Sequence, residues 1–471
     1  MWSRTARLAH RRAKRALSDK AHRVGLISLG CPKNLVDSEI MLGRLQERGY
    51  TVVDNAADAE TVLVNTCGFV EEAQQESIES ILEIAALKAE GGVARLLVAG
   101  CMVNRFGDEL AAAVPEIDGF VGLDDLDRVG DVVSIGGGPP SQGPAFKVFD
   151  HTAPRVVTTP GYAYLKVAEG CNNPCTFCAI PIWRGQLRSR TLGSLVTEAQ
   201  QLEAGGAREI CLVAQDTTRY GEDLGLGKDG LVKLVEVLLE QTTLPWIRFL
   251  YAYPTTLNPD LLRLMGEERR FVSYLDMPLQ HSHPDMLVAM KRGGRARHYL
   301  EQIELARELV PDIFLRSTFI VGFPGETREH FDHLLGFVRE ARFDHLGGFV
   351  YSPEDQTPAA ELPNRVPGPT AQRRYDELLE AQRPVALASR EGLVGRRIEV
   401  LVEGACDETE HLLQGRHRGM APGIDGRVLI NDGTAPAGSL VEVEITEAYA
   451  DDIVGRIVGS GIEHGVQLAV S

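Results

Sequence analysis

The sequence predicts an α/β protein with three folded parts: a doubly wound N-terminal domain, a partial (β/α)6 barrel and a small C-terminal antiparallel β-barrel. Three observations support this fold class. Apolar segments alternate with helical patterns from residue 24 to about residue 391, whereas short strands separated by glycine-rich turns follow. Glycine and proline gather between the first two parts, which indicates a linker.

These patterns divide the chain into five segments. At 471 residues with 44% hydrophobic content, the chain is long enough for several packed domains. The predicted boundaries are a basic tail over 1–21, the doubly wound domain over 22–135, a linker over 136–156, the (β/α)6 barrel over 157–391 and the small barrel over 392–460.

Charge is unevenly distributed along the chain. The formal net charge is −17, yet the first 23 residues carry eight Arg or Lys and a single acid. We predict that the basic tail is a solvated extension, with contact to RNA as the alternative. The acidic remainder favours a basic protein as partner over RNA, because an acidic surface repels a polyanion.

Cysteine usage indicates the compartment. Eight cysteines without a secretory signal predict metal ligands in a reducing environment rather than disulfides. The longest apolar runs have the length of strands and are too short to cross a bilayer. We therefore expect a cytoplasmic protein without membrane contact.

Three strand patterns of the first domain end at cysteines. They are residues 24–30 before Cys31, 61–66 before Cys67 and 94–100 before Cys101. Helical patterns at 32–49 and 71–88 separate them, as in successive strand-helix-strand units. Because parallel strands share one carboxyl edge, we expect these strand-end cysteines to converge as a three-thiolate site. The alternative is that each is a small buried apolar residue.

Six apolar segments between residues 162 and 351 alternate with helical patterns such as 231–240 and 299–309. The predicted strands are 162–168, 209–214, 246–252, 274–280, 314–322 and 345–351. A partial parallel barrel places its active site at the carboxyl ends of its strands. A long helical pattern over 370–391 follows the sixth strand.

The segment after the first strand of this barrel holds three cysteines, Cys171, Cys175 and Cys178, named here the loop cysteines. Structural zinc requires four ligands, and the next cysteine, Cys211, lies in a predicted buried strand. An iron–sulfur cubane held by three thiolates keeps one iron open for a further ligand. We predict such a cluster here, with structural zinc or chance clustering as the alternative.

The last segment has the texture of a small antiparallel barrel. Its predicted strands are 397–402, 426–430, 440–445 and 453–457. Barrels of this size often bind nucleic acid, but residues 393–457 hold twelve acidic side chains against six Arg. This charge makes the segment a poor clamp for RNA.

The spacing of the loop cysteines, with Phe177 before the last, resembles the signature of radical S-adenosylmethionine (SAM) enzymes. Other stretches are similar to the methylthiotransferase family within that superfamily. They are SLGCPKNLVDSE at 28–39, VNTCGF at 64–69, GYAYLK at 161–166, YLDMPLQH at 274–281 and VGFPGET at 321–327. The resemblance covers residues 22–460, and it implies an auxiliary-cluster domain, a radical SAM barrel and a terminal TRAM barrel.

This resemblance implies cofactors and a reaction. The loop cysteines would hold a four-iron four-sulfur cluster that binds SAM, and the strand-end cysteines a second such cluster. The implied reaction adds a methylthio group to the β-carbon of an aspartate in the twelfth small-subunit ribosomal protein, using two SAM, an external electron donor and a sulfur source. The alternatives are methylthio transfer to an adenosine of transfer RNA and a non-catalytic iron–sulfur scaffold.

Candidate SAM contacts lie at predicted strand ends and in the cysteine loop. They are Phe177, Gln215, Asp216, Gln280, Gly322 and Glu326. Each has an alternative as a capping, turn or packing residue. His281 and His283 lie close by, where a packed histidine is more common than a ligand. We expect Cys211 and Cys406 to be structural.

Overall fold

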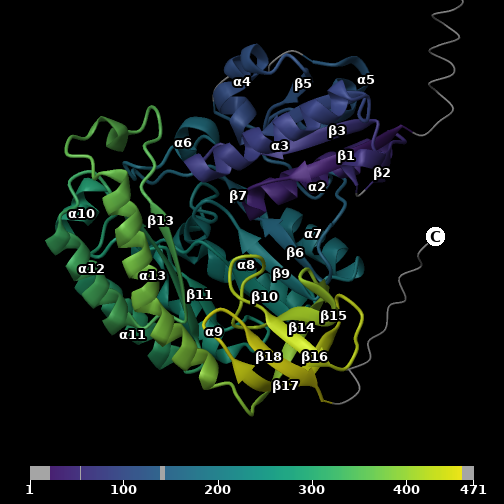
Figure 1. Cartoon of the computed structure of the whole chain (residues 1–471). Helices are drawn as coiled ribbons and strands as arrows, with labels where there is room; N and C mark the ends of the chain where they lie inside the picture. Colours follow the sequence, from purple (N-terminus) through teal and green to yellow (C-terminus); the bar gives the residue numbers. More distant parts are fainter. Residues whose placement is uncertain (1–21, 54, 138–143, 459–471) are drawn as a thin grey trace, which may run out of the picture. The chain divides into compact units, whose positions relative to one another are not determined.

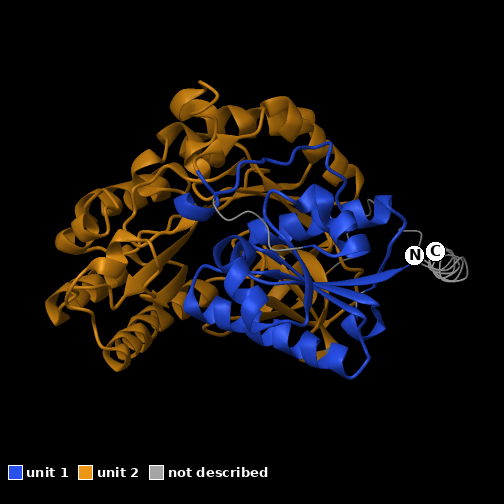
Figure 2. Ribbon diagram, turned by 90° about the horizontal axis from the view of Figure 1, so that it is seen from above, with its two compact units in different colours: residues 1–157, 181–185 blue, residues 158–180, 186–471 orange. Residues whose placement is uncertain are grey.

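The computed structural model of the protein describes residues 22–53, 55–137 and 144–458. Figure 1 shows its helices and strands in chain order. The chain forms two compact units, coloured separately in Figure 2. Unit 1 ends at residue 157 and also includes 181–185, and unit 2 holds 158–180 and the remainder of the chain. The predicted basic tail at 1–21 lies outside the described residues.

Unit 1 contains one sheet of five parallel strands in the order β2-β1-β3-β4-β5. The strands are β1 (Arg23–Ser28), β2 (Thr51–Val53), β3 (Thr61–Thr66), β4 (Arg95–Gly100) and β5 (Ile117–Val121). This is a doubly wound order, whose direction reverses between β1 and β3. Ligands of such sheets bind outside the carboxyl ends at that reversal, so β1 and β3 define the position of a site.

Four α-helices connect these strands and follow the last: α2 (Pro32–Glu47), α3 (Glu71–Ala89), α4 (Cys101–Ala113) and α5 (Val129–Ile135). Apolar residues of α3 and α4, including Ile81, Ile84 and Met102, pack with the strands in one core. The predicted doubly wound fold is confirmed. The prediction missed β2 and β5, because β2 has only three residues and β5 carries Asp118 and Gly119 in place of an apolar run.

Unit 2 contains the six parallel strands that the sequence predicts. They are β6 (Tyr162–Lys166), β9 (Glu209–Val213), β10 (Trp246–Phe249), β11 (Tyr274–Asp276), β12 (Phe314–Val321) and β13 (His345–Val350). They pair as β10-β9-β6 and β11-β12-β13, and a bridge between Ile247 and Phe271 connects the two groups. β11 stops before the predicted end at 280, because Gln280 pairs with β12 only through an isolated bridge to Phe319.

Helices cover these strands and close a large apolar core that includes Leu212, Phe249, Phe319 and Phe331. The helices are α7 (Leu192–Ala204), α8 (Gly230–Gln241), α9 (Pro259–Glu267), α10 (Pro284–Ala289), α11 (Ala296–Leu309), α12 (Arg328–Ala341) and α13 (Gly368–Glu391). A short hairpin of β7 (Ala168–Glu169) and β8 (Arg188–Ser189) brackets the loop cysteines in sequence. The single turn α6 (Ile180–Trp183) follows Cys178 in the chain, and all but its first residue belongs to unit 1.

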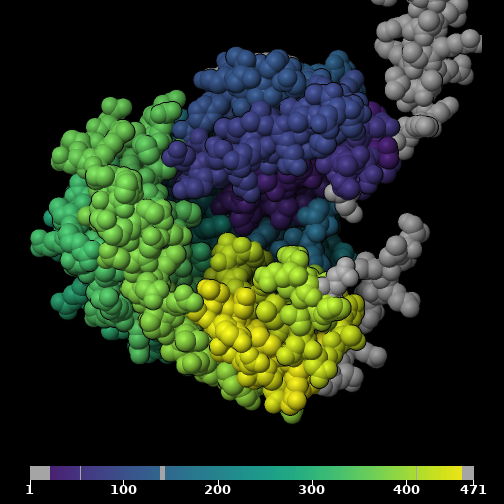
Figure 3. Space-filling view, viewed as in Figure 1, coloured from purple at the N-terminus to yellow at the C-terminus, as the bar shows by residue number. Residues whose placement is uncertain are grey.

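The C-terminal strands form a closed barrel in the order β14-β15-β16-β18-β17. They are β14 (Arg397–Cys406), β15 (Thr409–His417), β16 (Val428–Asp432), β17 (Leu440–Ala448) and β18 (Ile453–Ile457), coloured yellow-green to yellow in Figures 1 and 3. The predicted small barrel is confirmed, but β15 was missed because its sequence is largely polar. One of the five pairs, β16 with β18, runs parallel.

A buried ionic cluster joins this barrel to the parallel strands within unit 2. The Glu209 carboxylate accepts hydrogen bonds from Arg248 Nε at 2.6 Å and from Arg416 Nη2 at 2.8 Å. All three side chains are almost fully buried. Burial alone would raise the pKa of Glu209, but the two guanidinium groups outweigh it and lower that pKa. Removing one member of such a buried cluster costs about 3–5 kcal/mol, because an unpaired charge remains.

The length and hydropathy of the helices test whether any of them could cross a membrane. Within the described ranges, no helix is both long enough and apolar enough to span a bilayer.

Candidate cluster sites and cofactor edge

The loop cysteines follow β7, at the carboxyl end of the first barrel strand. Gly170 opens the loop at φ 78°, a backbone conformation that glycine adopts without strain. Hydrogen bonds from the Thr176 amide to the Met290 carbonyl at 3.0 Å and from Thr176 Oγ1 to the Ala289 carbonyl at 2.8 Å attach the loop to the end of α10. The loop is therefore held at both ends by the fold of unit 2.

The three loop thiols lie within electrostatic reach of one another. Burial raises the pKa of Cys171 to about 11, and the Asp216 carboxylate and Cys175 add to the effect. The pKa of Cys178 is raised to about 12, mainly by burial and then by the neighbouring Cys175 and Cys171. Cys171 and Cys178 therefore favour the thiol form without metal, and a metal that binds them must displace their protons.

The polar groups around the loop cysteines suit an anionic thiolate cluster. The Asn173 amide points at Cys171 Sγ from 3.4 Å, and Arg292 Nη1 lies 3.6 Å from Cys175 Sγ. The Arg292 guanidinium also stacks on the Tyr253 ring at 4.1 Å and donates to the Pro278 carbonyl at 2.5 Å. Three thiols with nearby N–H donors fit an iron–sulfur cluster that has three protein ligands.

The strand-end cysteines lie where the sequence places them, after three adjacent parallel strands. Cys31 is the N-cap of α2 after β1, Cys67 follows β3 directly, and Cys101 is the first residue of α4 after β4. Cys31 and Cys67 thus flank the reversal point between β1 and β3. The amino ends of α2 and α4 carry partial positive charge, which favours thiolates at Cys31 and Cys101.

Each strand-end thiol has a different electrostatic environment. Burial opposes ionisation of Cys31, but the charges of Lys33 and Arg184 and nearby backbone N–H groups outweigh it and lower its pKa. The pKa of Cys67 is raised to about 12, mainly by burial and then by the neighbouring Cys101 and Cys31. Burial also raises the pKa of Cys101, against the charge of Arg184. The three thiols therefore lie within electrostatic reach of one another.

Arg184 supplies positive charge beside this set. Its Nη2 lies 3.2 Å from Cys101 Sγ and 3.2 Å from Asp37 Oδ2, with both charged side chains buried. Arg184 belongs to the short segment 181–185 that is part of unit 1. The donor set of three thiols and a guanidinium fits a second iron–sulfur cluster.

Two glycines permit the strand ends to approach each other. Gly30 has φ 88°, and a Cβ there would lie 2.7 Å from Cys67 Cβ and 3.1 Å from its Sγ. Gly100 has φ 94°, and a Cβ there would lie 2.3 Å from Asn65 Oδ1. Any larger residue at either position would displace the cysteines or their supporting loop.

Gln215 and Asp216 lie at the carboxyl end of β9, beside the cysteine loop. Asp216 Oδ2 accepts a hydrogen bond from Asn173 Nδ2 at 2.7 Å, which ties this strand end to the loop. Burial raises the pKa of Asp216, against the hydrogen bonds from Thr218 and Asn173. Gln215 Nε2 donates to Glu169 Oε1 at 2.6 Å, whereas its buried Oε1 has no partner among the described residues.

Gln280 has an unusual backbone for its residue type. Its φ is 72°, and its N–H and C=O pair with Thr318 and Ile320 of β12 at 2.8 and 2.7 Å. Its side-chain Oε1 is buried and finds no hydrogen-bond donor in the described ranges. A strained backbone that presents an unsatisfied amide at a strand end is typical of a ligand-binding position.

Glu326 and Gly322 lie in one turn after β12. The Gly322 amide donates to Glu326 Oε2 at 3.1 Å, and Arg374 forms a short ion pair with the same carboxylate. His281 Nε2 lies 3.5 Å from Glu326 Oε2, and burial lowers the pKa of this histidine. The Glu326 carboxylate therefore holds its own turn, and a direct SAM contact from it stays a prediction.

The remaining predicted residues divide by environment. Phe177 is half-buried and packs against a small buried apolar cluster that includes Met286, Met290 and Phe323. Cys211 and Cys406 are buried within strands β9 and β14, as expected of structural thiols.

Sequence reasoning assigned no role to Arg184, Arg292 or Glu169. Glu169 receives Gln215 Nε2 and the Lys166 ammonium at 3.0 Å, so it connects the first two strand ends of the barrel. The sequence could have indicated Glu169, because it directly precedes the loop that carries the cysteines. No local sequence pattern identifies the two arginines, because each contacts a cysteine that is far from it in the sequence.

Family models match three successive parts of the chain. An uncharacterized protein family, UPF0004, matches residues 23–122, the radical SAM superfamily matches 165–338, and the TRAM domain matches 394–458. The parallel six-stranded fold, the loop cysteines and the superfamily match define the class: the chain is a radical SAM enzyme.

Curated relatives identify the family within that class. The ribosomal protein uS12 methylthiotransferase RimO of Myxococcus xanthus is 46% identical over 92% of this chain and 91% of its own length. The RimO protein of Anaeromyxobacter sp. (strain K) is 47% identical over 93% of this chain and 94% of its own length. That of Geobacter sulfurreducens is 44% identical over 94% of this chain and 100% of its own length. The chain belongs to the RimO family of methylthiotransferases.

Solved structures support the fold. Two structures of the radical SAM methyltransferase TsrM from Kitasatospora setae superpose with TM-scores of 0.53 and 0.54 at 16% and 14% identity. They match 72% and 77% of this chain, and 77% and 89% of the TsrM chains. At this identity the likeness concerns the fold alone.

Proposed function

We propose that this chain transfers a methylthio group to the β-carbon of an aspartate in small-subunit ribosomal protein uS12. The relatives named for this activity match almost the whole chain at 44–47% identity. The observation that carries the proposal is the presence of two separate three-thiol sets, one in each unit. The loop set alone can hold a cluster with one open iron for SAM, so the strand-end set requires a further role.

The reaction explains why two metal groups are needed. The C–H bonds of the aspartate β-carbon, which bears an ionised carboxylate, are too weakly acidic for a side-chain base, so a hydrogen atom must be removed instead. When bound, two four-iron four-sulfur clusters and SAM supply a carbon-centred radical and the methylthio sulfur. In this proposal the loop cysteines hold the cluster that receives SAM, and the strand-end cysteines hold the one that carries sulfur.

Side chains at the strand ends would bind and orient SAM. Gln215 and Gln280 each present a buried amide oxygen that has no partner in the described parts of the chain. Such oxygens suit the ammonium group or a ribose hydroxyl of SAM. Asp216, Gly322, Glu326 and Phe177 complete the proposed contacts, with Phe177 suited by its apolar surroundings to the adenine.

Charge favours a protein substrate. The chain is acidic overall, and its terminal barrel carries twice as many acids as arginines. A basic ribosomal protein is therefore attracted, whereas contact with RNA is secondary. We also propose that the enzyme acts in the cytoplasm and takes electrons and sulfur from external donors.

An anaerobic assay with SAM, a reductant and purified uS12 tests the proposal. The wild-type chain should release 5'-deoxyadenosine and give methylthiolated uS12 by mass spectrometry. Cys175→Ala should lose both products, whereas Cys67→Ala should keep some 5'-deoxyadenosine and lose the modified protein. Cys406→Ala is the matched control, because it removes a buried thiol outside both sets. Full methylthio product from Cys67→Ala would remove the role of the strand-end set.

The same assay separates the rival functions. A transfer RNA methylthiotransferase would modify transfer RNA and leave uS12 unchanged, with binding that weakens steeply as salt rises. A non-catalytic scaffold would contain iron and sulfide but would release no 5'-deoxyadenosine.

A further inference from the structure

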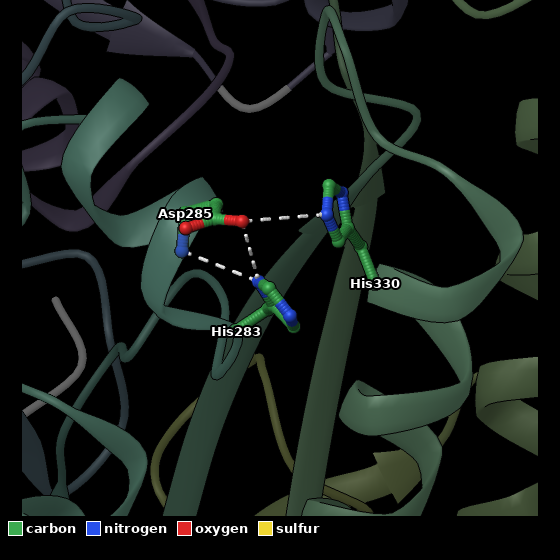
Figure 4. Close-up of side chains that lie close together, drawn as sticks. All are labelled: His283, Asp285 and His330. Atoms are coloured by element: carbon green, nitrogen blue, oxygen red, sulfur yellow. Dashed lines mark hydrogen bonds and ion pairs between the residues drawn. The ribbon is translucent and has the colours of Figure 1, made fainter.

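A histidine-rich group lies outside both cysteine sets, in unit 2. Side chains of His283, Asp285 and His330 converge so that one ligand atom from each lies within 4.8 Å of the others (Figure 4). Asp285 Oδ2 is 3.8 Å from His330 Nε2 and 4.0 Å from His283 Nδ1. The two imidazole centroids are 4.2 Å apart.

These ligands come from two separate elements. His283 is the N-cap of α10 and Asp285 lies in its first turn, whereas His330 lies in the first turn of α12. A third imidazole, His333, lies one turn further along α12, with its ring 5.1 Å from that of His283. The Ser282 hydroxyl holds His333 Nδ1 at 3.0 Å. Two imidazoles and a carboxylate thus form the group, and His333 packs beside His283 without belonging to it.

The group also has an ordinary structural role. His283 Nδ1 accepts a hydrogen bond from the Asp285 amide at 3.2 Å, and His330 Nδ1 accepts one from the Thr327 amide at 3.2 Å as part of a capping box. Both imidazoles are therefore helix caps in which Nδ1 is unprotonated. Helix capping alone does not explain why the two capping imidazoles lie beside the Asp285 carboxylate. A metal ion bound by all three side chains would explain it.

We propose that His283, Asp285 and His330 bind one divalent transition-metal cation of the zinc type. Neutral imidazole nitrogens and a carboxylate oxygen are the donors that Zn²⁺ takes in sites with an open position. The distances from Asp285 Oδ2 to His330 Nε2 and His283 Nδ1, 3.8 and 4.0 Å, are slightly longer than those between ligand atoms around zinc. Small side-chain rotations would bring the three atoms to bonding distance of one ion. His283 binds through Nδ1, the atom that faces Asp285 Oδ2, so its lone pair no longer accepts the hydrogen bond from the Asp285 amide. His330 binds through Nε2, which moves its proton to Nδ1 and releases the Thr327 amide.

The position of this cation gives it a mechanical role. The segment before His283 carries Gln280 and His281, and the turn before α12 carries Gly322 and Glu326. A cation bound by His283 and His330 ties these two strand-end segments together. The inference is independent of the proposed reaction, because it concerns metal binding and not turnover.

Two substitutions separate metal binding from helix capping. His283→Asn keeps a strong N-cap side chain, and His330→Gln keeps the residue type that completes a capping box. Both remove an imidazole ligand while preserving the caps. His298→Asn is the matched control, because His298 is an exposed histidine on α11 outside the group.

The test uses the full chain with both cysteine sets loaded with iron and sulfide under anaerobic conditions. Equilibrium dialysis against Zn²⁺ with metal analysis should give one extra zinc in wild type and His298→Asn. Binding should weaken at least about a hundredfold in His283→Asn and His330→Gln, as expected for loss of a direct ligand. Zinc X-ray absorption should show nitrogen and oxygen neighbours without sulfur.

A second readout follows from the cap exchange. Hydrogen exchange at the Thr327 amide should accelerate when Zn²⁺ binds, because His330 Nδ1 no longer accepts its hydrogen. The proposal would be overturned if the loaded protein bound no extra zinc or if the zinc had sulfur neighbours. It would also be overturned if His283→Asn and His330→Gln bound zinc as tightly as wild type does.

Discussion

The loop cysteines and the strand-end cysteines bring three thiols together by opposite routes. The loop cysteines share one short segment, which hydrogen bonds from Thr176 attach to the end of α10. The strand-end cysteines are far apart in sequence and meet only because β1, β3 and β4 are adjacent and parallel. One set depends on a local chain path, and the other depends on sheet register.

This difference predicts different sensitivities. A change in the sheet of unit 1 moves three elements relative to one another, so it disturbs the strand-end set more than any single loop change would. The loop set tolerates changes in strand register but depends on the backbone between Gly170 and Cys178. Three experiments test this contrast and a fourth tests the acid stability of unit 2; they follow in order of expected effect.

The largest effect should come from removing one complete set. Triple Ala substitution of the loop cysteines should reduce iron from about eight to about four per chain, as two independent four-iron clusters require. Triple Ala substitution of the strand-end cysteines should do the same while the loop cluster keeps its electron paramagnetic resonance signal. Iron and sulfide analysis of anaerobic protein checks both. A fall from four to none in the first variant would leave a single-cluster enzyme.

Gly30→Ala should selectively damage the strand-end set. The new Cβ would lie 2.7 Å from Cys67 Cβ, and the φ of 88° adds strain of about 1–3 kcal/mol. We expect a loss of about half the iron, with the loop cluster retained.

Gly91→Ala provides the matched control for this substitution. Gly91 has a similar φ of 81°, but no atom lies within 4 Å of the position of the added Cβ. Iron analysis of both variants separates backbone strain from contact with Cys67. Equal iron loss in the two variants would contradict the contact explanation.

Acid should weaken unit 2 through His417. Burial lowers the pKa of His417 to about 3, with the charges of His345, Arg248 and Arg390 adding to the effect. The unfolded chain binds a proton near pH 6.5 and the folded chain does not, so stability is full above pH 6.5 and falls as pH decreases toward 3. Each pH unit in that window costs about 1.4 kcal/mol.

Urea unfolding of unit 2 at pH 7.5 and pH 5 measures this effect. Wild type should lose about 2 kcal/mol between these values through His417 alone. His417→Asn should lose correspondingly less over the same interval, even if it is less stable at pH 7.5. An unchanged pH dependence in this variant would assign the acid sensitivity to other groups.

The smallest effect should come from the two arginines beside the thiols. Arg292 lies 3.6 Å from Cys175 Sγ, and Arg184 lies 3.2 Å from Cys101 Sγ while also pairing with Asp37. Gln at either position removes a positive charge that stabilises the reduced cluster, so the potential should fall by on the order of tens of millivolts.

A redox titration followed by electron paramagnetic resonance distinguishes the two substitutions. Each substitution should lower the reduction potential of only the cluster beside it. Arg292→Gln should have the larger effect, because Asp37 offsets part of the Arg184 charge. A common shift of both clusters would indicate that the arginines act through the fold and not on a neighbouring thiolate.

Local sequence patterns determined much of this protein. Buried apolar runs such as 61–66 predicted strands whose parallel order follows from the intervening helices, and Cys67 and Cys101 were placed correctly at strand ends. The same reasoning identified all six barrel strands and the loop cysteines. It failed at β2, β5 and β15, where strands are short or polar and only their neighbours in the sheet stabilise them.

Tertiary structure alone decided the contacts that surround these residues. Arg184 and Arg292 reach their cysteines from distant segments, and the left-handed backbone of Gln280 arises from pairing with β12 rather than from its own sequence. No sequence pattern connected His283 with His330, and only folding brings the first turns of α10 and α12 together. Spacing along a chain encodes which residues share a strand end or a loop, but the charges and ligands that meet there depend on packing between elements.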